Sequence, residues 1–244
     1  MAKMTYIYKH YSLTHLISMK IKWGSLVVDG RNKIGGHVAS ANRAGAYLRT
    51  KVSPKQPASI YSATVRARFS SIATSWKSIA ASARTLWNNA VSDYKSSDIF
   101  GDIKSPSGFN LYQKLNNNLV NCSIAMITTP PLPINVTQVK TLSLTAVHAG
   151  AITLTYTDAI PAAEAMIIRA TPALSPGKSF VKSEFRQIQV ALTADTSPLI
   201  ITTAYGTKYG AVGAAGEKIF VEVERVSTVT GQATKRVICS AIIS

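Results

Sequence analysis

Three prolines within four residues, Pro130, Pro131 and Pro133, interrupt the chain just past its middle. Proline lacks a backbone N–H and disfavours the helical conformation of the residue before it, so this stretch fits neither a helix nor a central strand. We therefore predict a stiff linker at residues 128–133. Before it, apolar residues recur at helical spacing; after it, they recur at every second position. The sequence thus predicts an α+β protein in two parts.

Residues 57–127 are predicted to form a helical domain. The apolar positions at helical spacing are Phe69, Ile72, Trp76, Ile79, Ala83, Leu86 and Ala90. They predict a helical hairpin or one kinked helix over residues 58–91, with Ser78 or Ser82 as the cap of a second helix. A third helix is expected to start near residues 105–107, because serine caps helices well and proline is tolerated in the first turn.

Residues 134–244 are predicted to form an all-β domain. Runs rich in Thr, Val, Ile and Tyr, several of them alternating with polar residues, lie at 138–147, 151–158, 165–170, 184–192, 199–205, 218–227 and 234–243. Glycine- and proline-containing turns separate them. Seven short strands in about 110 residues predict a sandwich like that of immunoglobulin or fibronectin type III domains. The Cys-Trp-Cys pattern of antibody domains is absent, because all three tryptophans precede residue 88.

The first third of the chain carries most of the formal net charge of +16. Residues 1–84 hold 14 lysines and arginines against a single acid, Asp29. A basic field of this size requires a polyanion or an acidic protein surface as its partner. Residues 130–244 hold 10 basic and 7 acidic residues, so the predicted β domain needs no such partner.

Residues 1–56 are predicted to be a basic, extended arm with short strands. Two runs, 37–40 and 45–52, predict two of these strands, and the glycine-rich segment 30–36 predicts a loop. Pro54 and Pro57 end the region. An irregular basic segment of this kind can become ordered on a neighbouring subunit.

Nine basic residues are the predicted anchoring or polyanion-binding positions. They are Lys20, Lys22, Arg31, Lys33, Arg43, Arg49, Lys51, Arg66 and Arg68. Aromatic residues, Trp23, Tyr47 and Tyr61 among them, are interspersed with these cations. Basic side chains neutralise phosphates and aromatic rings stack on bases, so DNA is one expected partner. An acidic protein lattice would explain the same charge, and the sequence leaves both partners open.

The sequence lacks the residue patterns of catalytic sites, so we predict that the protein is not an enzyme and takes no metal or cofactor. No histidine lies at a metal-ligand spacing from cysteines or carboxylates. The glycines at 206, 210, 213 and 216 lie between predicted strands, which indicates a hairpin loop rather than a phosphate-binding loop. Cys122 and Cys239 are expected to be small buried hydrophobes. No apolar run is long enough to span a bilayer, so no membrane contact is expected.

An ordered motif spans much of the N-terminal half. Residues 35–49 read GGHVASANRAGAYLR, which is similar to GG-x-V-x-S-x-N-R-x-G-x-Y-x-R. The R-x-x-F, W and R-x-x-W elements of the motif follow at Arg66, Phe69, Trp76, Arg84 and Trp87. This order resembles a pattern found in structural proteins of tailed bacteriophages and prophages, and the resemblance covers residues 24–131. It implies a virion structural protein of the head or tail whose immunoglobulin-like domain faces outward.

The resemblance also implies the setting of the protein. Its partners would be capsid or tail subunits within a symmetric homo- or hetero-oligomeric assembly, with packaged DNA as a further contact. It would be made in the host cytoplasm and located in the virion. Two alternatives remain open from the residues alone. One is a nucleic-acid-binding protein that uses the basic helical region, and the other is a surface-binding adhesin that uses the sandwich, with Tyr205 and Tyr209 as candidate contacts.

Overall fold

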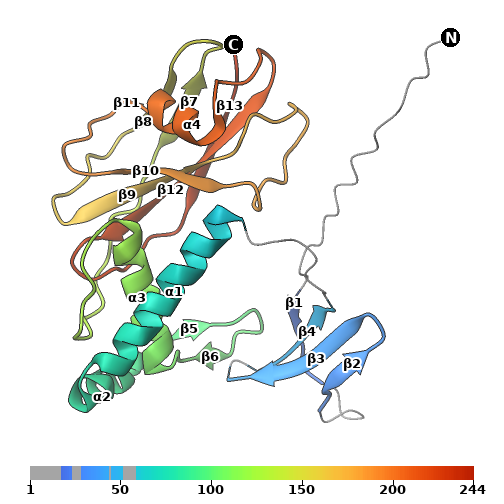
Figure 1. Cartoon of the computed structure of the whole chain (residues 1–244), viewed down its shortest axis with the longest axis vertical. Coiled ribbons are helices and arrows are strands. Elements are labelled where there is room, and N and C mark those ends of the chain that lie inside the picture. Colours follow the sequence, from blue (N-terminus) through green and yellow to red (C-terminus); the bar gives the residue numbers. More distant parts are fainter. Residues whose placement is uncertain (1–17, 24–28, 44, 52–58) are drawn as a thin grey trace. The chain divides into compact units, whose positions relative to one another are not determined.

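The computed structural model describes residues 18–23, 29–43, 45–51 and 59–244 (Figure 1). Internal packing divides the chain into an N-terminal unit, residues 1–61 with 96–104, and a main unit, residues 62–95 with 105–244. Helices and several antiparallel sheets coexist, so the predicted α+β class is confirmed. The helices and the C-terminal strands belong to the same unit. The predicted domain boundaries at 56, 128 and 133 stay predictions.

The N-terminal unit is built on a small antiparallel sheet with the strand order β1-β4-β3-β2. Its strands are β1 (Ser18–Lys20), β2 (Asn32–Ile34), β3 (His37–Asn42) and β4 (Gly45–Thr50). The two predicted strands at 37–40 and 45–52 are confirmed as β3 and β4. The predicted loop at 30–36 is wrong in part, because Ile34 pairs with His37 across a two-residue turn. Gly35 adopts a φ of +57° there, so the glycines close a hairpin.

A short hairpin completes the N-terminal unit. It consists of β5 (Ser96–Ser97) and β6 (Ile103–Lys104), which pair antiparallel. Its apolar side chains lie largely in solvent, since Ile99 is 75% and Ile103 73% exposed. The hairpin therefore has almost no core of its own and depends on polar contacts.

The helical part of the main unit contains α1 (Ile60–Ser78), α2 (Ala81–Ala90), a 3-10 turn (Val91–Tyr94) and α3 (Gly108–Asn121). The predicted hairpin and third helix are confirmed. The predicted serine cap of α2 is wrong, because Ala80 precedes the helix and no side chain caps it. Ser107 does cap α3, where its hydroxyl accepts the N–H of Asn110 at 3.2 Å.

The core of the helical part lies between α3 and the two preceding helices. It consists of Ile72, Trp87, Leu111, Tyr112 and Leu115. The predicted apolar face of α2 is displaced by one residue, since the indole of Trp87 is fully buried while Leu86 is half exposed. The larger ring gains more by burial than the leucine, and it also stacks edge-on against Tyr112.

The proline-containing segment 128–133 is held by side chains on both sides of it. The indole N–H of Trp87 donates to the carbonyl of Thr128 at 2.7 Å, and the hydroxyl of Tyr94 donates to the carbonyl of Pro131 at 2.8 Å. The amide of Gln232, from the C-terminal strands, donates both to the Tyr94 hydroxyl and to the carbonyl of Leu132. The segment is thus an extended connection fixed between the helices and the strands.

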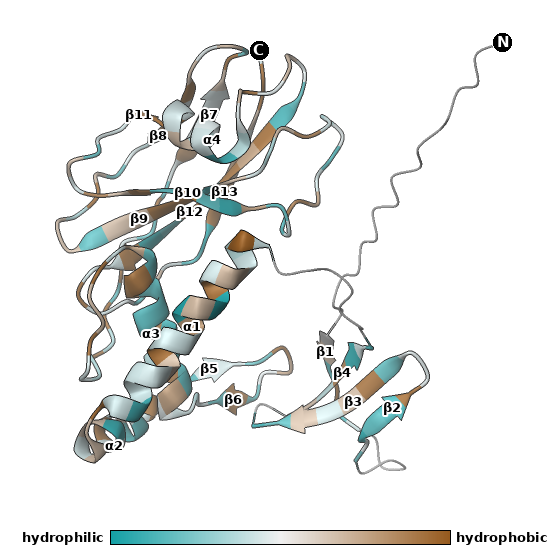
Figure 2. Ribbon diagram, viewed as in Figure 1, coloured by the Kyte–Doolittle hydropathy of each residue, from teal (hydrophilic) through white to brown (hydrophobic). Residues whose placement is uncertain are grey.

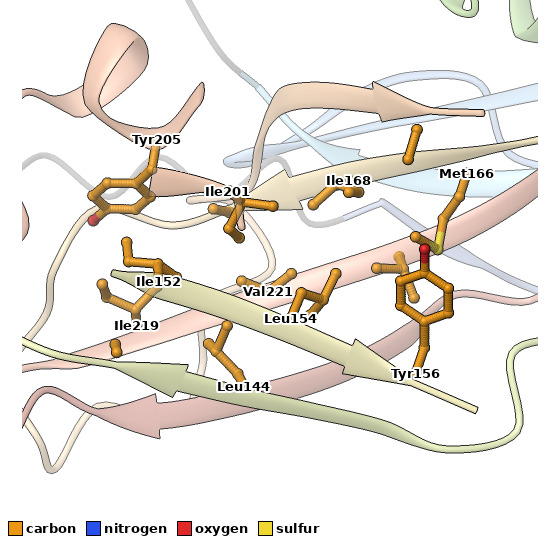
Figure 3. Close-up of a cluster of buried hydrophobic side chains, with 14 of the residues drawn as sticks. Leu144, Ile152, Leu154, Tyr156, Met166, Ile168, Ile201, Tyr205, Ile219 and Val221 are labelled. Atoms are coloured by element: carbon orange, nitrogen blue, oxygen red, sulfur yellow. The ribbon is translucent and has the colours of Figure 1, made fainter. Parts of the chain in front are cut away.

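Two antiparallel sheets make up the rest of the main unit, with the orders β10-β9-β12-β13 and β11-β8-β7. The strands are β7 (Leu142–Ala146), β8 (Ile152–Tyr156), β9 (Glu164–Ala170), β10 (Arg186–Ala191), β11 (Leu199–Ile200), β12 (Lys218–Ser227) and β13 (Val237–Ile242). Inward-facing side chains of both sheets, such as Leu154, Ile168 and Val221, form the core between them (Figure 3). All seven predicted strand runs contain a strand.

The fifth predicted strand, 199–205, is wrong in its second half. Only Leu199 and Ile200 pair with β8, and α4 (Thr202–Tyr209) follows at once. The helical turn brings the ring of Tyr205 into the core, where it is 1% exposed and contacts the ring of Tyr209. Burial of a large ring outweighs the strand preference of the Ile-Ile-Thr-Thr run.

The end of α3 packs directly against the four-stranded sheet. Cys122 joins Ala165, Ile167 and Val226 in a small apolar cluster. The Asn118 side-chain amide donates to the carbonyl of Gly231 at 2.8 Å. Helices and sandwich therefore form one packed body.

Candidate polyanion-binding surface

Strand register places four of the predicted cations, Lys20, Lys33, Arg49 and Lys51, on one face of the N-terminal sheet. Lys33 lies opposite Val38, and Val38 lies opposite Arg49. Directly opposed residues of antiparallel strands share a face, and residues two apart on one strand share it too. Lys51, which follows β4 and donates its N–H to the carbonyl of Gly36, continues the alternation. We call the face that carries Lys33, Arg49 and Lys51 the basic face.

The ring of Tyr47 belongs to the basic face, since Tyr47 lies two residues before Arg49. Its cross-strand neighbours are Ser40 on β3 and Lys20 on β1. The ring is half-buried, whereas Lys33, Arg49 and Lys51 are exposed. An aromatic ring thus lies among side chains that carry positive charge.

The centre of the opposite face of the sheet is apolar. Ala39 is 2% exposed there and lies opposite Leu48, which in turn lies opposite Met19. The same face also carries polar residues, Asn32, His37 and Thr50. Figure 2 shows mixed hydropathy along β3, with hydrophilic ends and a hydrophobic middle. The exposed charges of the basic face are on one side of the sheet because side chains alternate along its strands.

The nine predicted cations differ in whether they form an ion pair. Lys20 pairs with Asp98 at 3.3 Å, Lys22 with Asp102 at 3.1 Å, and Arg31 with Asp29 at 3.1 Å. Within the described residues, no ion pair involves Lys33, Arg43, Arg49 or Lys51. All 11 acids of the chain lie in the described ranges. The basic face therefore presents three cations that form no ion pair with a described residue, Lys33, Arg49 and Lys51, together with Lys20, which is paired with Asp98.

The other two predicted anchoring residues belong to the main unit. Arg66 is exposed on α1. Arg68, two residues further along α1, donates a hydrogen bond from its guanidinium to the side-chain carbonyl of Asn121 on α3. Arg68 thus has a structural contact that ties α1 to the end of α3. The structure brings Lys33, Arg49 and Lys51 together on one face, and it places Arg66 and Arg68 in a different unit.

The carboxylate of Asp98 organises the hairpin that neutralises Lys20. One of its oxygens accepts the backbone N–H groups of Phe100, at 2.8 Å, and of Asp102, at 3.1 Å. Burial acts to raise the pKa of Asp98, but these two N–H donors and the ammonium of Lys20 outweigh it, so its pKa lies below the ordinary value of 3.8. The ammonium of Lys22 also lies 5.2 Å from the ring centre of Phe100.

Acid is expected to loosen the β5–β6 hairpin. A carboxyl group with a lowered folded-state pKa stabilises the fold fully above its unfolded pKa, near 3.8, and the contribution is lost as the pH falls through the lower folded value. Hydrogen exchange of the Phe100 and Asp102 amides should accelerate below about pH 3.8. In an Asp98→Asn variant, exchange should be fast already at neutral pH. Amides that stay protected through this range in the wild type would contradict the assignment.

A concave region lies on the outer face of the four-stranded sheet, β10-β9-β12-β13. It is a groove of about 550 Å³ whose lining includes Phe180, Glu222, Glu224, Arg236 and Ile238. Arg169 bonds both Glu222 and Glu224, at 3.1 and 2.8 Å, and Arg236 approaches the same two carboxylates. The two carboxylates are thus paired with two arginines, and the lining also includes Lys182 and Lys235, so the groove carries a small net positive charge. No motif or spacing in the sequence indicated this cluster.

Among the described residues, the remaining reactive side chains do not come together as a chemical centre. Burial raises the pKa of the Cys122 thiol to about 11 and that of Cys239 to about 12, so both are neutral at physiological pH. Cys122 is buried as predicted, and Cys239 is partly buried against the core. In the described part of the chain, no three His, Cys, Asp or Glu side chains lie together as a metal site would require. None of the helices described has the length and apolar character needed to cross a membrane.

Comparisons with protein-family models, with curated proteins and with solved structures find no match for this chain. The arguments for its function therefore rest on its own residues.

Proposed function

We propose that the protein is a non-enzymatic structural component of a tailed-bacteriophage virion, anchored by the basic face of its N-terminal unit to an acidic partner. The observation that carries the proposal is the set of cations without acids beside them, Lys33, Arg49 and Lys51. Three exposed like charges on one sheet face repel one another in the free protein, so an anionic partner that neutralises them is favoured. The resemblance of residues 24–131 to phage structural proteins supplies the setting.

The main unit would serve as the rigid, outward-facing body of this component. Its helices and strands share a packed junction, and its charges on the outer sheet face are paired with one another. The main unit holds 16 basic and 8 acidic residues, a net charge of +8 that equals the charge of the N-terminal unit but is spread over about two and a half times as many residues. This lower density of charge suits exposure to solvent better than it suits binding of a polyanion. We propose capsid or tail subunits as the partners of the basic face, in a symmetric assembly.

We further propose that the sandwich is of the immunoglobulin or fibronectin type III class. The first, second and fifth strands form one sheet, and the third, fourth, sixth and seventh form the other. In immunoglobulin-like sandwiches the third strand likewise pairs with the sixth, which pairs with the seventh, across from the first and second. The fourth strand here lies beside the third, as the added strands of variable-type domains do.

An adhesin function for the sandwich has no observation in its favour. The two tyrosines that could have supported it are structural. Tyr205 is buried, and the hydroxyl of Tyr209 donates to the carbonyl of Ala170 at 2.7 Å. Neither ring is placed to stack on a sugar.

Mass spectrometry of purified particles tests the proposal. The protein should be present in particles at a fixed copy number, and replacement of Lys33, Arg49 and Lys51 by glutamine should reduce that number at least tenfold. Each exposed charge contact contributes up to about 1 kcal/mol, so three lost contacts suffice for such a reduction. The matched control replaces three exposed lysines of the main unit that form no ion pair within the described residues, Lys77, Lys114 and Lys182, by glutamine and should be incorporated normally. Recovery of the wild-type protein only from host cytosol, never from particles, would contradict the proposal.

A further inference from the structure

We infer that the basic face binds single-stranded nucleic acid, with Lys33, Arg49 and Lys51 on its phosphates and the ring of Tyr47 stacked on a base. The inference rests on the proposed function in taking the basic face as the binding surface. It goes further by naming the chemical class of the partner.

The spacing of the cations follows from strand geometry. Arg49 and Lys51 are two residues apart on one strand, so their Cα atoms lie about 6.7 Å apart. Lys33 lies two strands away from Arg49 in the same row, which corresponds to about 9.6 Å. A nucleic-acid strand that runs along β4 would therefore meet a cation at successive phosphates, with Lys33 alongside. Flexible Lys and Arg stems accommodate the remaining differences in spacing.

The position of Tyr47 distinguishes a nucleic acid from other anions. Strand β4 carries Tyr47 and Arg49 at alternate positions, and Lys51 continues the alternation just after the strand. The ring therefore lies next to the cations on the same face. Its neighbour on β3, Ser40, is small, and its neighbour on β1 is Lys20, whose ammonium is paired with Asp98. Aromatic side chains on an exposed sheet face are the means by which sheet-based proteins stack unpaired bases. An acidic protein surface would use the cations and leave the ring without a role.

A single strand fits this face better than a duplex. The bases of a duplex are stacked on one another, so a side chain that stands on a flat sheet cannot reach their faces. A duplex is read by an element that enters a groove, such as a helix or a free two-stranded ribbon, whereas β3 and β4 are the central strands of a four-stranded sheet. An unpaired strand exposes both its phosphates and its bases to the same surface.

Fluorescence anisotropy with labelled 20-residue oligothymidylate tests the inference on the full chain. Replacement of Tyr47 by leucine should weaken binding by about five- to one-hundredfold, the range that stacking on one base provides, without a change in the salt dependence. Tyr47→Phe, which retains the ring, should bind like the wild type. The triple variant K33Q/R49Q/K51Q should lower the slope of log affinity against log salt concentration by about 2, since each phosphate contact contributes about 0.7.

Photocrosslinking provides a test that needs no variant. An oligonucleotide that carries 5-iodouracil should crosslink to Tyr47 in the wild-type protein, and peptide mass spectrometry identifies the site. Crosslinks confined to other residues would overturn the inference. So would a Tyr47→Leu variant that binds as tightly as the wild type and has a native far-ultraviolet circular dichroism spectrum.

The same assays separate the inference from the proposed function. Tighter binding of a 20-base-pair duplex than of the single strand, with no effect of Tyr47→Leu, would overturn the inference in favour of charge-only recognition. Full competition by polyglutamate, with no effect of Tyr47→Leu, would identify an acidic protein as the partner. In either case, loss of the K33Q/R49Q/K51Q variant from particles would leave the virion proposal standing.

Discussion

Replacement of Arg225 by methionine is expected to lower the free energy of unfolding by about 3–5 kcal/mol, the usual cost of leaving one partner of a buried ion pair alone. The guanidinium of Arg225 is fully buried, and its Nη1 atom lies 3.9 Å from Oε2 of Glu164. Another of its nitrogens donates to the backbone carbonyl of Asp158. Methionine fills similar space but leaves the carboxylate of Glu164, which is 8% exposed, without its cation.

A double variant isolates the ion pair from the loss of packing. Glu164→Gln removes the charge but keeps an acceptor for the N–H of Thr137, which Glu164 accepts at 3.0 Å. In the Arg225→Met/Glu164→Gln protein, neither position carries a buried charge. The loss of unfolding free energy in this double variant should therefore be smaller than the sum of the two single losses by at least about 1.5 kcal/mol. Urea unfolding, followed by tryptophan fluorescence to which the buried Trp87 contributes, measures the free energy of unfolding of each variant. Additive losses would contradict a coupled pair.

Replacement of Gly231 by alanine is expected to cost about 2–4 kcal/mol, because it disturbs the joint between α3 and the sandwich. Gly231 adopts a φ of +72°, which alanine occupies only with strain. A Cβ atom there would lie 2.9 Å from the backbone carbonyl carbon of Leu115, and closer still to its oxygen. Leu115 is in the middle of α3 with a 1% exposed side chain, so its backbone has little freedom to move away.

Gly216 offers a matched control for the Gly231 variant. Its φ of +88° is equally unfavourable for alanine, but a Cβ atom there would meet nothing within 4 Å. Gly216→Ala should therefore cost only the backbone strain, about 1–2 kcal/mol. Thermal unfolding of the two variants, monitored by circular dichroism, compares them. Equal losses would show that α3 and the β12–β13 turn are not packed as tightly as described.

The repeating pattern of hydrophobic residues was enough to predict most elements of this fold. The strands from β7 to β13 and the three helices before them lie where the hydrophobic pattern predicted them, although β9 and β12 are buried on both faces. Errors occurred where a single side chain decided the local structure. Tyr205 turns residues after 200 into a helix, and Trp87 displaces the buried face of α2 by one position.

The candidate site was only partly predictable, for a physical reason. The uneven distribution of charge pointed to the N-terminal third, and the pattern of strands allowed Lys33 and Arg49 to share a face. Which cations are neutralised depends on contacts that are distant in sequence. Asp29 lies two residues from Arg31 and could have been anticipated, whereas Asp102 bonds Lys22 across 80 residues of chain. Only the folded hairpin β5–β6 brings those charges together.

The central claim is that cations without an acid beside them, rather than total charge, bind the acidic partner. Two triple variants that remove the same number of charges test it directly. K33Q/R49Q/K51Q removes the cations of the basic face, and K20Q/K22Q/R31Q removes cations that are paired with Asp98, Asp102 and Asp29. The measurement is the salt concentration at which each folded variant elutes from an immobilised polyanion such as phosphocellulose. The account predicts clearly earlier elution of the first variant than of the second, and equal shifts of the two would contradict it.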